Sequence, residues 1–248
     1  MADPNTLRRV AGAIPGRAYM LAYKHDCSIQ TLLDCQDEVH RLGNHPHIPT
    51  YHRDEMLSWF HLPRWISEDT ASHATGTALD LDCGRGVLAA FCREALGSEV
   101  YCACRGRREL SGRAEEKYGL QVAEYYFESE ECPWDVAFDI VMMPGLLGQL
   151  EAHPVDMLTG ISKLLADAGR MYLSAPVARR AERAGKGEDA GLRPEDGGPA
   201  WTVHEFSKDE LLSVVDSAGL AVERFGYAPG CLQKHFNMAL SCQEHARL

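Results

Sequence analysis

The chain has 248 residues, of which 45% are hydrophobic and 25% charged, and its formal net charge is −11. This composition is typical of a soluble globule, and no apolar run approaches the roughly 20 residues that span a bilayer. The acidic charge repels phosphate backbones and excludes bulk nucleic-acid binding. Residues 1–5 lack the basic and then apolar pattern of a signal peptide, so we expect a cytoplasmic protein without membrane contact.

Nine cysteines without a signal peptide favour reduced thiols over a disulfide framework, and none forms a C-x-x-C pair. Cys102 and Cys104 have strand spacing, and we expect them to pack rather than to bind zinc. The histidines between His40 and His61 are irregularly spaced, so a surface position is favoured for them. The sequence therefore predicts no metal site.

Residues 1–74 are expected to form an N-terminal helical cap. Apolar residues at helical spacing predict a helix over 28–42, with Ser28 as its N-cap and Gly43 after its last turn. A second, short helix is expected from Arg53 to Phe60, and Pro63 is expected to end it.

From residue 77 the chain alternates between apolar strands and amphipathic helices. The expected strands are 77–82, 99–104, 120–127, 138–143 and 170–174. Helices are expected after the first, second and fourth of these, ending near Leu96, Tyr118 and Leu165. Strands that alternate with helices imply right-handed crossovers and a parallel, doubly wound sheet.

Residues 177–200 interrupt this rhythm, since they are rich in glycine, proline and charge. They predict a long exposed loop or lid near the substrate opening. A capping signature from Ser207 to Glu210 then begins a helix that Gly219 ends. Two final strands, 221–227 and 235–241, are close enough in sequence to form an antiparallel pair. The fold class is therefore α/β, with domain 75–248 after the cap.

The run from Ala78 to Gly86 is the most informative segment, because it is an apolar strand that ends in a turn of small residues. A helical pattern begins directly after it, at Val87. A strand, a glycine turn and a helix start are typical of nucleotide binding, since glycines let a ligand approach the backbone and the helix offers unpaired N–H groups.

With the elements that follow, this run resembles the first motif of the class I S-adenosylmethionine-dependent methyltransferases. Segments 138–143, 163–174 and 203–220 are similar to the family's fourth strand, fifth strand and late helix, and the closing hairpin is similar to its reversed seventh strand. The resemblance covers residues 75–242. It implies a seven-stranded Rossmann-like sheet with the last strand antiparallel, S-adenosylmethionine as cofactor and a small-molecule substrate.

The resemblance also implies which residues bind the cofactor. Cys104 stands where an acid normally accepts the ribose hydroxyls, and Glu128 matches the acid that receives the adenine amino group, with Glu130 or Glu131 as substitutes in a shifted register. Phe127 and Trp134 would flank the adenine. The full set of expected cofactor contacts is Asp80, Asp82, Cys83, Gly84, Gly86, Cys104, Glu128, Met143 and Arg53.

Four departures from the family pattern bear on activity. Gly148-Gln149 stands in place of the usual Glu-His, and Asp167-Ala168 in place of the usual Pro-Gly. Asp82 replaces the first glycine and brings a carboxylate near the cofactor's own carboxylate, which is costly unless a cation such as Arg53 intervenes. Cys104 is a poor acceptor, and an unpaired buried hydroxyl costs roughly 1–3 kcal/mol. For Arg105 and the arginines after it, we expect a solvated helix face.

Three hypotheses follow, and the closing hairpin argues against one of them, a dinucleotide oxidoreductase. The first is methyl transfer to a small molecule, driven mainly by proximity and orientation, with His204 as the candidate base. The alternative is a catalytically lapsed protein of the same fold that acts as a binding or scaffold partner. The sequence leaves open whether the chain forms a homodimer or binds a protein partner.

Overall fold

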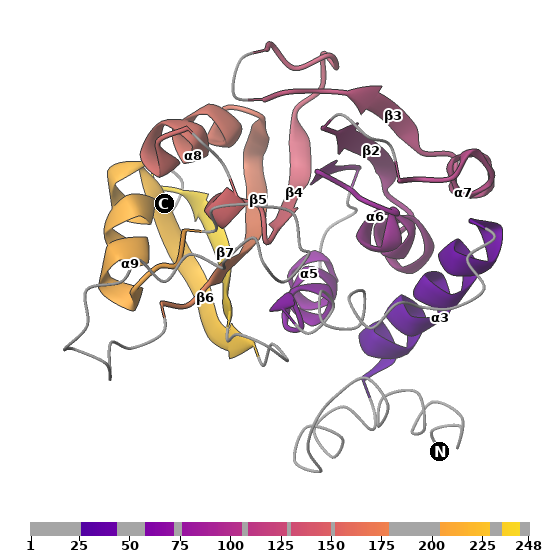
Figure 1. Cartoon of the computed structure of the whole chain (residues 1–248), viewed down its shortest axis with the longest axis horizontal. Helices are drawn as coiled ribbons and strands as arrows, with labels where there is room; N and C mark the ends of the chain where they lie inside the picture. The colour runs from indigo at the N-terminus through magenta and orange to yellow at the C-terminus, as the bar shows by residue number, and fades with distance from the viewer. Residues whose placement is uncertain are drawn as a thin grey trace, which may run out of the picture.

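Seven strands form one sheet in the order β3-β2-β1-β4-β5-β7-β6 (Figure 1). The structure, a computed structural model, describes residues 26–43, 58–71, 76–105, 109–127, 130–149, 152–178, 204–228 and 235–243. Strands β1 to β5 pair in parallel, whereas β7 runs antiparallel between β5 and β6. This topology confirms the doubly wound sheet with a reversed last strand. The strands are β1 Thr77–Leu81, β2 Glu99–Cys104, β3 Gln121–Glu124, β4 Phe138–Pro144, β5 Leu165–Pro176, β6 Leu220–Ala228 and β7 His235–Cys242.

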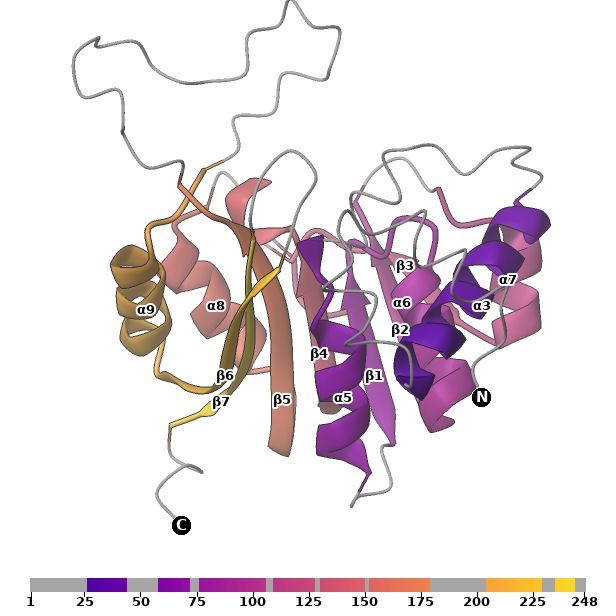
Figure 2. The same ribbon diagram turned by 90° about the horizontal axis from the view of Figure 1, so that it is seen from below.

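Helices cover both faces of the sheet, because α8 and α9 pack in one buried cluster and α3, α6 and α7 in another. In Figure 2, α8 and α9 lie near β5, β6 and β7, whereas α3, α6 and α7 lie near β1, β2 and β3. Among the described residues, no helix is long and apolar enough to cross a membrane. A short 3₁₀ turn, η2 Leu147–Gln149, follows β4. The remaining helices are α3 Cys27–Leu42, α5 Leu62–Thr70, α6 Val87–Phe91 with its π-helical continuation η1 Cys92–Leu96, α7 Gly112–Tyr118, α8 Pro154–Ser162 and α9 Lys208–Ser217.

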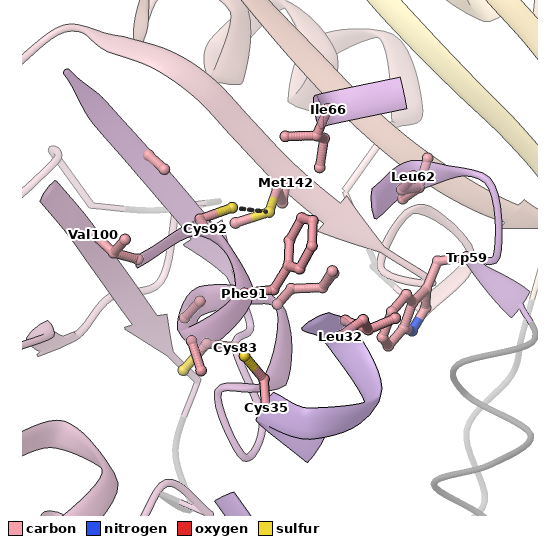
Figure 3. Packing of buried hydrophobic residues seen from close by; sticks show 14 of the residues in the cluster. Leu32, Cys35, Trp59, Leu62, Ile66, Cys83, Phe91, Cys92, Val100 and Met142 are labelled. Carbon is pink, nitrogen blue, oxygen red and sulfur yellow. Dashed lines mark hydrogen bonds between the residues drawn. The ribbon is translucent and has the colours of Figure 1, made fainter. Parts of the chain in front are cut away.

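The core lies on both faces because successive strand side chains point to opposite sides. On the face of α8 and α9, Leu79 and Leu81 of β1 are fully buried. On the other face α3 and α5 share one core with α6, and Figure 3 shows the side chains that meet there, among them Leu32, Ile66, Phe91 and Met142. The predicted cap helix therefore packs directly on the layer that follows β1. The domain boundary near residue 74 stays a prediction.

The N-terminal helices differ from the expectation in two places. Asp26, rather than Ser28, caps α3, since its carboxylate accepts the backbone N–H of Ser28 at 2.9 Å. The helix expected over 53–60 falls mostly outside the described residues. Residues 59–61 form turns, and Pro63 lies at the beginning of α5 instead of ending a helix. Proline is tolerated there because the first helical turn has no use for its missing N–H.

Strand β5 begins at Leu165, five residues earlier than predicted, and the preceding helix ends at Ser162. A register shift between β4 and β5 accommodates the extra residues, as a β-bulge does. The capping box that joins Ser207 and Glu210 is confirmed at the start of α9. Of the predicted lid, only residues 177 and 178 lie in the described part, where Val177 bridges to Phe206.

Candidate functional site

The sheet changes direction at β1, since β2 and β3 lie on one side of it and β4 on the other. Open α/β sheets bind their ligands outside the carboxyl ends of the strands at such a switch point. The turn that follows β1 lies at this edge. It contains four of the residues that the sequence predicts as cofactor contacts, Asp82, Cys83, Gly84 and Gly86.

Three residues of this turn adopt left-handed backbone conformations, with φ of 62° at Asp82, 52° at Gly84 and 82° at Gly86. The backbone conformation favours glycine at position 86, and a Cβ there would also lie 2.7 Å from Leu110 Cδ1, so that this side chain would have to shift. At Gly84, in contrast, a Cβ would meet no atom within 4 Å. The backbone of the turn is therefore open on the side of Gly84, where a ligand can approach it.

Asp82 does not present a bare carboxylate, because Arg105 Nη2 lies 3.2 Å from its Oδ2. The Asp82 side chain is 35% exposed and that of Arg105 is 19% exposed, so the pair lies at the rim of the sheet rather than in solvent. The guanidinium carbon of Arg105 also lies 5.9 Å from the ring centre of Phe127. The expectation of a solvated helix face is thus wrong for Arg105, which follows β2 directly and folds back onto the turn.

A second arginine lies in the same turn. The side chain of Arg85 is 17% exposed, and its Nε lies 3.6 Å from Glu109 Oε2. Within the described part of the chain, Nε and Nη1 of Arg85 are buried without a hydrogen-bond partner. Buried guanidinium donors are stabilised by an acceptor, so this edge of the sheet has donors available for a polar ligand.

Beneath the turn, the sulfur of Cys83 lies 3.5 Å from that of Cys104, and both side chains are buried. A hydrogen bond with Cys102 raises the pKa of Cys83 most, with further contributions from burial and from the charge of Asp80. Asp80 is itself buried in β1. Cys104 therefore belongs to a packed group of thiols, as the sequence predicts. No group of three or more metal-ligating side chains occurs among the described residues.

Aromatic side chains that follow β3 form a cluster, of which Phe127 lies under Arg105. Trp134 packs edge to face on Tyr101, and Tyr125 contacts both Trp134 and Phe127. Glu130, the substitute for Glu128, accepts the backbone N–H of Tyr126 at 2.9 Å. Glu128 and Arg53 lie outside the described residues, so their expected contacts to the cofactor stay predictions.

On the side of β4, Met143 is fully buried in the core, and the next residue but one, Gly145, donates its backbone N–H to Ser174 Oγ at 2.7 Å. His204 lies beside the 3₁₀ turn, because its N–H donates to the Gly148 carbonyl at 2.7 Å. Its Nε2 is 2.8 Å from Glu210 Oε1. The structure therefore places His204 near the ends of β4 and β5.

Comparisons with known proteins bear on the fold. No protein-family model matches the sequence, and no curated protein matches it. Solved structures match at low identity. Magnesium protoporphyrin IX methyltransferase from Synechocystis PCC 6803, solved with bound S-adenosylhomocysteine (SAH), is 12% identical with a TM-score of 0.58, over 92% of this chain and 100% of that one.

Two other solved structures are similar to the same extent. An S-adenosylmethionine-dependent methyltransferase from Clostridium acetobutylicum ATCC 824 is 11% identical with a TM-score of 0.55, over 75% of this chain and 91% of that one. The cyclase SpnF is 12% identical with a TM-score of 0.57, over 79% and 84% of the two chains. At such identities the likeness shows the fold alone, and it confirms the methyltransferase-type fold that the sequence motifs predict.

Proposed function

We propose that this chain binds S-adenosylmethionine at the carboxyl edge of β1 and transfers its methyl group to a small-molecule acceptor. The observation that carries the proposal is the position of the 82–86 turn, whose left-handed residues lie at the switch point of a methyltransferase-type sheet. Solved structures of the same fold, among them the Synechocystis enzyme, contain SAH.

The residues of this edge suggest how each part of the cofactor is held. Gly84 leaves the backbone accessible to the amino-acid moiety. Nε and Nη1 of Arg85 have no hydrogen-bond partner among the described residues, and we assign them to the cofactor's acceptors. Phe127, which lies under Arg105, is expected to flank the adenine with Trp134. When bound, S-adenosylmethionine supplies an electrophilic methyl group. The chain contributes mainly orientation, which can account for much of the acceleration of a bimolecular transfer.

For acceptors that must lose a proton, we infer that His204 is the base. Glu210 holds one ring nitrogen of His204, as a carboxylate does in many catalytic sites where it orients an imidazole. Segment 177–200 and the cap are the parts from which we expect acceptor specificity. Because a cyclase has the same fold, the fold alone does not determine the reaction, and the proposal needs a direct test.

Isothermal titration with S-adenosylmethionine and SAH tests binding, and transfer of a radiolabelled methyl group to a panel of small amines, phenols and thiols tests turnover. We expect heat with both ligands and labelled product with at least one acceptor class. Absence of heat at millimolar ligand contradicts the proposal. Binding without transfer to any acceptor favours the lapsed alternative instead.

A matched pair of glycine variants shows where the ligand binds. Gly84→Asn keeps a left-handed backbone and places a side chain in the open space beside the turn, so we expect it to abolish binding. Gly97 has φ of 70° and, like Gly84, no atom within 4 Å of an added Cβ, but it lies after η1. Gly97→Asn should therefore bind the cofactor as the parent protein does. Equal effects of the two changes contradict this location.

A further inference from the structure

We propose that Asp82 binds the ribose hydroxyls of the cofactor, in place of the acid that is missing at Cys104, and that Arg105 positions its carboxylate. The inference rests on the proposed function, since it assigns one part of the same ligand. It differs from the expectation for this fold class, in which the ribose acid lies at the end of the second strand.

Positions 82 and 104 are neighbours at the ends of two adjacent, paired strands. Leu81 of β1 is in register with Ala103 of β2, so the next residues of the two strands lie side by side. The backbone N–H of Cys83 donates to the Ala103 carbonyl at 3.0 Å, which keeps the chains paired beyond the strand ends. An acid at 82 is therefore displaced by only one strand spacing, about 4.8 Å, from an acid at 104.

The Asp82 side chain is directed toward the end of β2. Its Oδ2 lies 3.2 Å from Nη2 of Arg105, the residue that follows Cys104, so the carboxylate reaches over the end of β2. An ionised carboxylate accepts about four hydrogen bonds. The contact with Arg105 uses part of this capacity, and the side chain is 35% exposed, so acceptor positions remain for a vicinal diol.

Cys104 cannot itself serve as the acid that accepts the ribose hydroxyls. The Cys104 sulfur packs against Cys83 in the core and offers no carboxylate. Arg105, held over Phe127, offsets the negative charge that Asp82 would otherwise bring near the cofactor's carboxylate. The acid that is missing at the end of β2 is thus replaced by an acid at the neighbouring end of β1, which keeps one carboxylate at the ribose edge.

The backbone conformation of Asp82 also supports a role in ligand binding. Asp82 is the non-glycine residue with positive φ in the described part of the chain. Glycine adopts this conformation at less cost than aspartate does, and a partly exposed ion pair returns little stability, so folding alone favours glycine here. Strained residues of this kind persist at ligand sites, where the side chain serves another purpose.

The experiment compares SAH with its 2′,3′-dideoxy analogue by isothermal titration. We expect the parent protein to prefer SAH by about tenfold or more, the effect of hydrogen bonds to a charged group. Asp82→Asn keeps a residue that tolerates left-handed backbone. It should weaken SAH binding by about tenfold and change binding of the analogue by less than about twofold. Asp156→Asn removes an exposed carboxylate from α8 and should change neither.

A second variant tests whether an acid at the end of β2 can take over the role of Asp82. Cys104→Asp, added to Asp82→Asn, returns an acid to the end of β2 and should restore the preference for SAH over the analogue. The inference is overturned if Asp82→Asn weakens binding of both ligands equally or leaves both affinities unchanged. It is also overturned if the change strengthens SAH binding, because Asp82 then blocks the site. If the parent protein binds neither ligand, the proposed function fails, a result distinct from all three.

Discussion

The sulfur atoms of Cys83 and Cys104 lie 3.5 Å apart, where the turn after β1 meets the end of β2. Three further cysteines are buried in the same core, Cys35 in α3, Cys92 in η1 and Cys102 in β2. Thiols pack as small, polarisable apolar groups, so this cluster supports the candidate site from below without exposing a nucleophile.

Native thiol reactivity should follow burial, and α3 provides a matched pair. Cys27 is exposed, whereas burial raises the pKa of Cys35 to about 12. Because the thiolate is the reactive form, iodoacetamide at pH 8 should modify Cys27 rapidly and Cys35 only after unfolding in urea. Peptide mass spectrometry at successive times measures both rates. Equal rates in the native protein contradict the packing of α3 on the sheet.

Two glycines, one at the bulge of β5 and one in α8, are expected to change the free energy of unfolding in opposite directions when replaced by alanine. A Cβ at Gly169 would lie 2.5 Å from the Phe138 carbonyl oxygen and 3.0 Å from the backbone of Ala166, atoms that cannot move aside. Gly169→Ala should therefore lower the free energy of unfolding by about 1–3 kcal/mol. Gly160→Ala, in the open interior of α8, should raise it by about 1 kcal/mol. Urea denaturation followed by circular dichroism measures both, and a stable Gly169→Ala protein contradicts the bulge.

The bounds of the strands are the part of the fold that the sequence predicts best. The bounds of β2, 99–104, agree with the expectation, and those of β1 and β4 differ by one residue. Apolar runs bounded by turn residues are local signals, so one sequence is enough to find them. Pro63 shows the limit of such signals, because a proline indicates a helix boundary without telling whether the helix begins or ends there.

The candidate site was less predictable, since it depends on contacts between strands. The sequence places Asp82 in the turn, but its partner Arg105 is 23 residues away and meets it only because β1 and β2 pair. The arginine's position directly after a strand was the available signal. The expected partner of Asp82, Arg53, lies outside the described residues.

A buried asparagine in β7 holds the segment before α5 on the sheet. Asn237 donates to the Ser58 carbonyl at 2.7 Å and accepts the backbone N–H of His61 at 3.1 Å. Asn237→Ala leaves the Ser58 carbonyl and the His61 N–H without their partner, and water does not reach these groups easily. We therefore expect a loss of about 1–3 kcal/mol in the free energy of unfolding. Ser241→Ala, at a less buried position of the same strand, should cost less than about 0.5 kcal/mol. Chemical denaturation distinguishes the two, and equal losses contradict this role for Asn237.

His235, the first residue of β7, is expected to make the folded protein less stable in acid. Burial lowers the pKa of His235 from 6.5 to about 4, because the charged imidazole would lose its water. Between these values the unfolded chain binds a proton that the folded chain does not. The free energy of unfolding should therefore fall as the pH drops from about 6.5 to 4, by up to about 3 kcal/mol from this residue.

Variants at two histidines separate this effect from the titration of the carboxylates, which all proteins compared have in common. His235→Gln should lose less stability than the parent protein between pH 7 and pH 4, so the difference between them narrows or reverses as the pH falls. His153→Gln changes an exposed histidine before α8 and should follow the parent protein. Urea midpoints at pH 7.0, 5.5 and 4.5 measure the slopes. A His235→Gln slope equal to that of the parent protein shows that His235 is not buried in its neutral form.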